Sequence, residues 1–103
     1  MRNPPEACAT MAEVRAGVDS VDRELVALLA ERFRFMDAAA RIKPARGQVR
    51  DEARKRQVIE NAMAEAERRG LDPATIGQLW DALVEASIAH ELEQWDRLRT
   101  AAE

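Results

Sequence analysis

The chain has few of the residues on which several classes of protein depend. Its 103 residues include one cysteine, one histidine and four aromatic side chains. A single cysteine, Cys8, cannot form an internal disulfide, and we expect a structural or incidental role for it. A single histidine, His90, gives no cluster that resembles a metal site. We therefore expect no metal and no other cofactor.

Excess positive charge and long apolar runs are also missing. The formal net charge is -3, so no global positive field draws the protein to nucleic acid or to an anionic membrane. No run approaches the roughly 20 apolar residues that span a bilayer, and the first residues lack the apolar core of a signal peptide. We expect a cytoplasmic protein that has neither nucleic acid nor a membrane as a partner.

The residues that are abundant favour helices. Alanine, leucine, glutamate and arginine are common in the chain, and these residue types propagate helices, whereas strand formers are scarce. The length is that of one domain, and a domain this small buries about 60 to 70% of its unfolded surface. We predict a flexible N-terminal segment over residues 1–9 and a single all-helical domain over residues 10–100.

The first predicted helix is too long for a monomer. Thr10 and Glu13 have the spacing of a capping box at a helix start, and Pro44 disfavours helical geometry at Lys43. At 1.5 Å per residue this helix is about 48 Å long, which exceeds the width of a compact domain of this size. Its apolar seam needs a partner along its whole length, and we predict an intertwined homodimer. The seam consists of Met11, Val14, Val18, Val21, Leu25, Leu28, Phe35, Ala39 and Ile42.

Two shorter helices are predicted to follow. Residues 44–48 contain proline and glycine and are typical of a loop. Asp51 can cap a second helix that runs to Arg69 and stops at Gly70. Asp72 and Pro73 supply the cap and first-turn proline of a third helix, which ends near residue 100. The apolar stripe of the third helix is Ile76, Leu79, Trp80, Leu83, Val84, Ile88, Trp95 and Leu98.

One cation, Arg32, interrupts the seam of the first helix, and a second, Lys43, lies just beyond its end. Arg32 occupies a position where its neighbours in the heptad are apolar, and an unpaired guanidinium there would cost several kcal/mol. It can form a buried salt bridge with another helix, or its charged end can extend to solvent. Lys43 lies 11 residues further on, which is about three turns, so both side chains share one face. Two cations facing one space favour a bound anion.

Polar residues also interrupt the third helix. Ser87 and Glu91 are one turn apart and are predicted to point inward between Val84 and Trp95. They can hydrogen-bond across the core, or they can face a ligand.

The remaining charged candidates lie on the first two helices. The start of the second helix is either a solvated charge run or an anion site at a helix N-terminus. Arg15 lies almost five turns before Arg32, so it can reach only a site on another subunit. Otherwise it forms an exposed ion pair with Asp19 or Asp22. The start of the second helix carries Arg50, Asp51, Arg54, Lys55 and Arg56.

In order and spacing, these segments resemble the all-helical, or type II, chorismate mutase family, which includes the related isochorismate-pyruvate lyases. The resemblance spans residues 11–98. It implies an intertwined dimer with two identical sites, each completed by an arginine from the partner subunit. It is carried by residues 13–22, 28–32, 41–43 and 49–51, together with Arg54, Ser87 and Glu91.

The resemblance also implies roles for individual residues. Arg15 from the partner subunit and Arg32 would clamp the two carboxylates of the substrate, helped by Arg54. Lys43 would donate to the ether oxygen and to a nearby carboxylate. Glu91 stands where the best-known bacterial pattern has a glutamine that donates to the ether oxygen, and fungal members resemble this chain there.

Three further positions complete the implied site. Asp51 lies where the family holds the ring hydroxyl, and Ser87 lies where a hydroxyl contacts a carboxylate. Lys55 replaces a glutamate that binds the ring hydroxyl in the bacterial pattern, which suggests a different contact or a different substrate decoration.

The implied reaction is the Claisen rearrangement of chorismate to prephenate, an isomerase step of the shikimate pathway and of aromatic amino-acid biosynthesis. It needs no cofactor, because catalysis comes from holding a reactive conformer and stabilising charge on the ether oxygen.

Three alternatives stay open. The N-terminal segment and the region of Trp95 resemble the lyase branch, which forms salicylate and pyruvate, although Asp51 and Ser87 are closer to the mutase pattern. An amino-substituted chorismate is a second possible substrate. A non-enzymatic helical adaptor, whose polar seam residues set register, is the third alternative.

Overall fold

The computed structural model describes residues 2–101, which are helical and contain no strand. This confirms the all-helical prediction with three main helices. The chain divides between Arg34 and Phe35 into two compact units, which are described separately. No helix within residues 2–101 combines the length and the apolar character needed to cross a membrane. In chain order the elements are the 3-10 turn η1 (Pro5–Ala7), α1 (Met11–Ile42), the 3-10 turn η2 (Arg46–Gln48), α2 (Glu52–Arg68) and α3 (Pro73–Ala101).

The helix starts follow the capping residues predicted from the sequence. The Thr10 hydroxyl oxygen accepts a hydrogen bond from the backbone N–H of Glu13 at 3.2 Å. The Asp51 carboxylate accepts one from the backbone N–H of Arg54 at 3.0 Å. Each bond satisfies an amide that has no partner within its own helix. Helix α1 ends at Ile42, one residue before the position that Pro44 disfavours.

A glycine turn joins α2 to α3. Gly70 has a φ of 76°, in the left-handed region that glycine adopts without a steric penalty. The amide of Leu71 bonds to the carbonyl of Ala66 at 2.8 Å, which with the Gly70 amide completes a Schellman motif. A Cβ at Gly77 would lie 3.0 Å from the sulfur of Met63, so glycine permits the close approach of α3 to α2.

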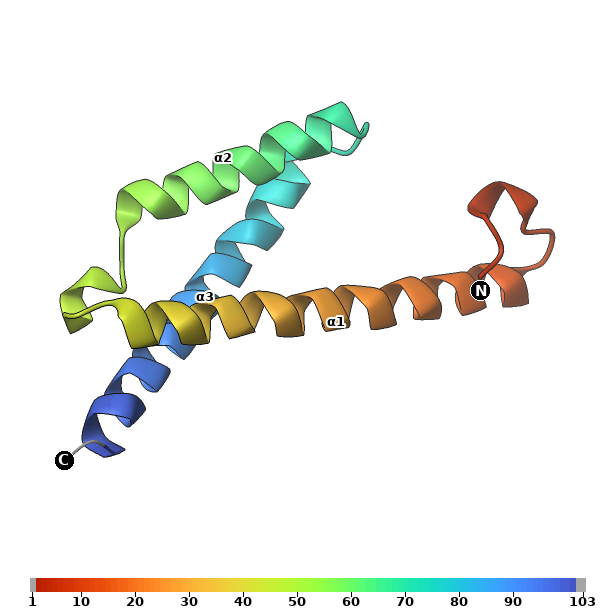
Figure 1. The fold of residues 1–103 in the computed structure, drawn as a ribbon. Coiled ribbons are helices and arrows are strands. Elements are labelled where there is room, and N and C mark those ends of the chain that lie inside the picture. Colours follow the sequence, from red (N-terminus) through yellow and green to blue (C-terminus); the bar gives the residue numbers. More distant parts are fainter. Residues whose placement is uncertain (1, 102–103) are drawn as a thin grey trace. The chain divides into compact units, whose positions relative to one another are not determined.

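In the first unit, the segment before α1 folds back on that helix (Figure 1). Arg2 donates to the Glu24 carboxylate at 2.6 Å, and Asn3 donates to the Glu13 carboxylate at 2.9 Å. Met1 lies outside the described residues, and the flexibility of residues 1–9 stays a prediction. The apolar seam of α1 is exposed along this unit, with Leu28 at 62%. Each apolar residue of the seam within this unit is therefore only partly covered, with exposed fractions from 38% to 62%.

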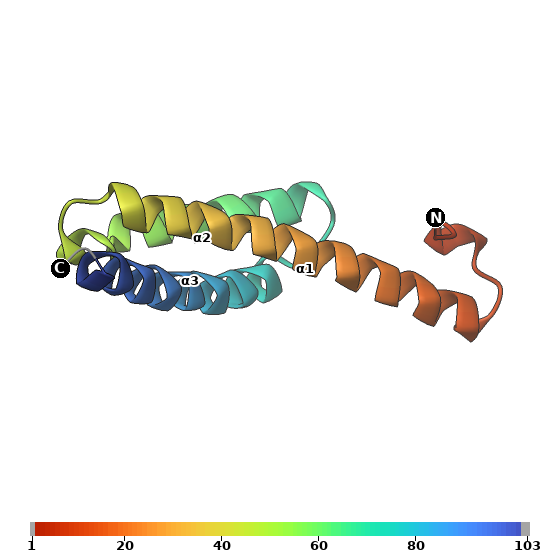
Figure 2. The same ribbon diagram turned by 60° about the horizontal axis from the view of Figure 1, so that its bottom comes forward.

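The second unit contains α2, α3 and the last turns of α1, which lie beside α3 (Figure 2). Its core is formed by Val49, Val84 and Ile88, and partly buried residues of α2 and α3 pack around them. At the end of the predicted stripe of α3, Leu98 is exposed. Helix α2 has 17 residues and α3 has 29, so α2 cannot cover the whole length of α3. Leu79, which belongs to the same stripe, is exposed as well.

Candidate active site

Lys43 is the first residue beyond the end of α1. Its backbone amide still donates to the carbonyl of Ala39 at 2.9 Å, so the helix direction persists to this residue. Its side chain is 31% exposed, and Nζ lies 2.8 Å from Oε2 of Glu91. The same ammonium is 3.5 Å from the carbonyl oxygen of Val49. The lysine therefore combines two anchoring contacts with partial access to solvent.

Glu91 is a buried carboxyl group on α3, with an exposed fraction of 4%. Its Oε2 forms an ion pair with the ammonium group of Lys43. Within residues 2–101 no other group supplies a hydrogen bond to this oxygen. Buried polar atoms nearly always have such a partner. Among the described residues, the ion pair with Lys43 is thus the interaction that compensates this buried oxygen.

Ser87 lies one turn before Glu91 and is also buried, at 3%. The inward orientation of both residues is therefore confirmed. The serine hydroxyl donates to the carbonyl of Leu83 at 2.7 Å, a bond to its own helix rather than to the glutamate. Its predicted contact with a substrate carboxylate stays a prediction.

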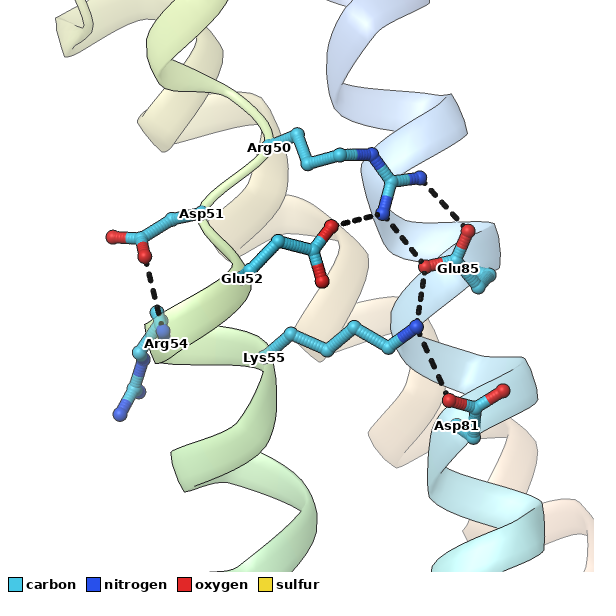
Figure 3. Close-up of polar contacts among 7 residues, drawn as sticks. All are labelled: Arg50, Asp51, Glu52, Arg54, Lys55, Asp81 and Glu85. Atoms are coloured by element: carbon cyan, nitrogen blue, oxygen red, sulfur yellow. Dashed lines mark hydrogen bonds and ion pairs between the residues drawn. The ribbon is translucent and has the colours of Figure 1, made fainter.

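The predicted site residues at the start of α2 point in two directions (Figure 3). Asp51 and Arg54 lie on one side of the helix, where Asp51 caps it and exposed Arg54 donates to Gln57 at 2.7 Å. Lys55 reaches the opposite way, toward α3. The structure thus separates Lys55 from Asp51 and Arg54, and the binding role of each stays a prediction.

Lys55 belongs to an ion-pair network between α2 and α3, which also contains Arg50. Its Nζ lies 2.8 Å from Glu85 and 3.1 Å from Asp81, and its side chain is 19% exposed. Arg50 reaches Glu85 with both terminal nitrogens, at 2.8 and 3.1 Å. Hydrogen bonds from Arg50 and then Lys55 lower the pKa of Glu85 to about 2, and bonds to Glu85 and Asp81 raise the pKa of Lys55. This network holds the start of α2 against α3.

The low pKa of Glu85 predicts a loss of stability in acid. The folded-state pKa is below its ordinary value of 4.5, so the contribution is complete above about pH 4.5 and is lost as pH falls toward 2. Comparing chemical unfolding of the unmutated and Glu85→Gln proteins should show a difference at pH 6 that shrinks across this window. Glu93→Gln, which breaks an exposed pair with Arg97, is the control. A difference independent of pH would contradict the prediction.

Comparison with known proteins identifies the family. The model of the family named chorismate mutase type II matches residues 14–92. The chain belongs to this family. A curated relative, the isochorismate pyruvate lyase of Pseudomonas aeruginosa PAO1, is 28% identical over 98 residues, which cover 95% of this chain and 97% of the relative. The family resemblance is therefore confirmed. Membership in the chorismate mutase type II family is compatible with either a mutase or a lyase reaction.

The remaining residues that the chorismate mutase type II resemblance implies lie in the first unit. Arg15 is exposed and, among the described residues, forms no ion pair with Asp19 or Asp22. Arg32 is half-buried and has an interaction within the described chain. Both arginines belong to the first unit, whereas Lys43 and Glu91 belong to the second. The roles of the two arginines in a site with Lys43 and Glu91 stay predictions.

Proposed function

We propose that this protein is a chorismate mutase that converts chorismate to prephenate. The observation that carries the proposal is the pairing of Lys43 with the buried Glu91, whose Oε2 has no hydrogen bond from the described residues. Both groups can donate to one acceptor, the lysine through its ammonium and the glutamate when it carries a proton. Such a pair of donors suits a substrate oxygen that gains negative charge during the reaction.

The reaction requires such donors and no nucleophile. The C–O bond between the ring and the enolpyruvyl group breaks while a C–C bond forms, and negative charge grows on the ether oxygen as the first bond lengthens. Lys43 and protonated Glu91 stabilise this charge. The implied role of Arg15 and Arg32 is to hold the two substrate carboxylates, so that the enolpyruvyl group stays over the ring.

A lyase activity on isochorismate is the second candidate. The curated lyase that matches nearly the whole chain favours it. In that reaction the same type of C–O bond breaks, and a ring hydrogen moves to the enolpyruvyl methylene carbon, which leaves salicylate and pyruvate. Donors to the ether oxygen serve both reactions, so Lys43 and Glu91 support either one. The mutase is preferred because Asp51 and Ser87 are closer to the mutase pattern.

The experiment that tests the proposal supplies chorismate and isochorismate separately to the purified protein and identifies the products by chromatography. We expect prephenate from chorismate at a rate that Lys43→Ala abolishes. Salicylate and pyruvate from isochorismate, without prephenate, would establish the lyase. If neither compound gives a product and neither raises the melting temperature, the protein is the non-enzymatic helical adaptor.

We also propose that the chain functions as an intertwined dimer. The support is the exposed apolar seam of α1, which includes Val18, Leu25 and Leu28. A second copy of this chain would remove these side chains from water, at about 25 cal/mol for each Å² of apolar surface. Sedimentation at micromolar concentration should therefore give about twice the chain mass of 11.6 kDa. Leu25→Asp should shift the protein to monomers, and a monomer without any substitution would refute the dimer.

A further inference from the structure

The carbonyl group of Lys43 is held from α3 by two side chains. The indole N–H of Trp95 donates to this oxygen at 3.0 Å, and Nη2 of Arg99 donates to it at 2.7 Å. The last carbonyl groups of a helix have no donors within their own helix. Residue 44 is a proline, so the chain cannot continue the helix to supply them. The backbone at Lys43 is thus fixed by residues more than 50 positions away.

Arg99 extends the contact to the last turn of α1. Its Nη1 donates to the carbonyl of the fully buried Ala40 at 2.6 Å. Its guanidinium lies 4.3 Å from the centre of the Trp95 ring, and this contact restricts the orientation of the guanidinium plane. The planar guanidinium of Arg99 therefore joins the carbonyl of Ala40 in α1 to the carbonyl of Lys43 just beyond the helix, and Trp95 adds a second donor to the Lys43 carbonyl.

We propose that Trp95 and Arg99 are positioning residues, which fix the backbone at Lys43 and so hold its ammonium beside Glu91. The inference rests on the proposed function, because it assigns these residues to the reaction through Lys43. A lysine ammonium sits on a flexible four-carbon stem. Of the contacts that hold Lys43, those made by Trp95 and Arg99 act on its backbone rather than on its ammonium.

The position of the backbone matters because the ammonium must meet the ether oxygen at hydrogen-bond distance. A displacement of 1 Å in a group that positions a reaction can cost about 100-fold in rate. The alternative is that Arg99 merely stabilises the end of α1 through its charge, which is favourable near a helix C-terminus. A lysine at position 99 would keep that charge but could not donate to two carbonyls in the fixed geometry of the guanidinium.

The first experiment compares kcat and KM of Arg99→Ala, Arg99→Lys and Trp95→Phe with the unmutated protein, on the substrate that the unmutated protein converts. We expect kcat to fall about 10-fold or more in both Arg99 variants. Trp95→Phe keeps an aromatic ring at this position and loses the indole N–H donor, so a smaller decrease in kcat is expected. Arg97→Ala is the matched control, because Arg97 lies on the same helix and pairs with exposed Glu93. Full activity in Arg99→Lys would overturn the inference.

A double-mutant cycle separates positioning from a general structural role. If Arg99 acts through Lys43, Arg99→Ala should change kcat/KM less than about twofold in a Lys43→Ala background. An equal loss in both backgrounds would overturn the inference. If Lys43→Ala is too slow to measure, the same cycle is run on the Kd for the product. An unmutated protein that converts neither chorismate nor isochorismate would refute the proposed function, whereas an active protein with an unimpaired Arg99→Ala variant would refute the positioning role alone.

Discussion

Replacing Glu91 with glutamine should make the rate nearly independent of pH and should preserve or increase activity at pH 7.5 and above. A carboxyl group next to an ether oxygen that gains negative charge helps catalysis when it is protonated and repels that charge when it is ionised. The unmutated protein should therefore be most active in acid and slow down as pH rises. The side-chain amide of glutamine does not titrate, so Glu91→Gln keeps an N–H donor as pH rises. The pH profiles of kcat for the two proteins test this directly.

Two further variants make the result specific to Glu91. Glu91→Ala removes the donor, and its loss should be about 100-fold or more at every pH, which is the usual effect of removing one such donor. Glu93→Gln changes an exposed carboxylate on the same helix and should keep the original profile. A constant rate between pH 5 and 8 in the unmutated protein, or an unchanged profile in Glu91→Gln, would show that Lys43 acts without this carboxyl.

Replacing Arg32 with alanine should abolish turnover while leaving a folded helical protein, because the clamp on a substrate carboxylate is lost. Arg15→Ala should do the same. If each site takes Arg15 from one subunit and Arg32 from the other, mixing the two inactive proteins restores one intact site in each heterodimer. Equal mixing should then recover about a quarter of the unmutated activity, because half of the dimers are heterodimers and each heterodimer has one intact site of two.

The control for the mixing experiment is Arg34→Ala, which removes an exposed arginine of α1. This variant should stay active by itself, and mixing it with the unmutated protein should not change the rate. Subunit exchange is verified with two chains of different mass. No recovery after complete exchange would rule out sharing of the site, and an active Arg32→Ala protein would remove Arg32 from it.

Local features of the sequence predicted the helix boundaries well. Thr10, Asp51 and Gly70 each act on residues within a few positions, so their effect does not depend on the rest of the fold. The inward orientation of Ser87 and Glu91 also follows from one helix alone, since both interrupt an apolar stripe of 3.6-residue periodicity.

Contacts between distant parts of the chain could not be predicted in the same way. Asp81 and Glu85 are one turn apart on α3, which could have marked an acidic face, but nothing in the sequence selects Lys55 as their partner. The sequence pattern predicts Trp95 only as a residue of the apolar stripe, because the acceptor of its indole N–H is a backbone carbonyl that no side-chain pattern reveals. The sequence thus predicted polar groups near the site better than it predicted the contacts that hold them.

The contacts between Lys43 and the end of α3 also bear on the order in which the protein is made. Synthesis begins at the N-terminus, so all of α1 and Lys43 leave the ribosome before Trp95 and Arg99 exist. Until residue 95 is available, the Lys43 carbonyl lacks both of its side-chain donors, and until residue 99 is available it lacks one of them. The arrangement of Lys43 beside Glu91 therefore gains this support only after the final turns of α3 are synthesised, and a nascent chain that ends before them has the lysine without it.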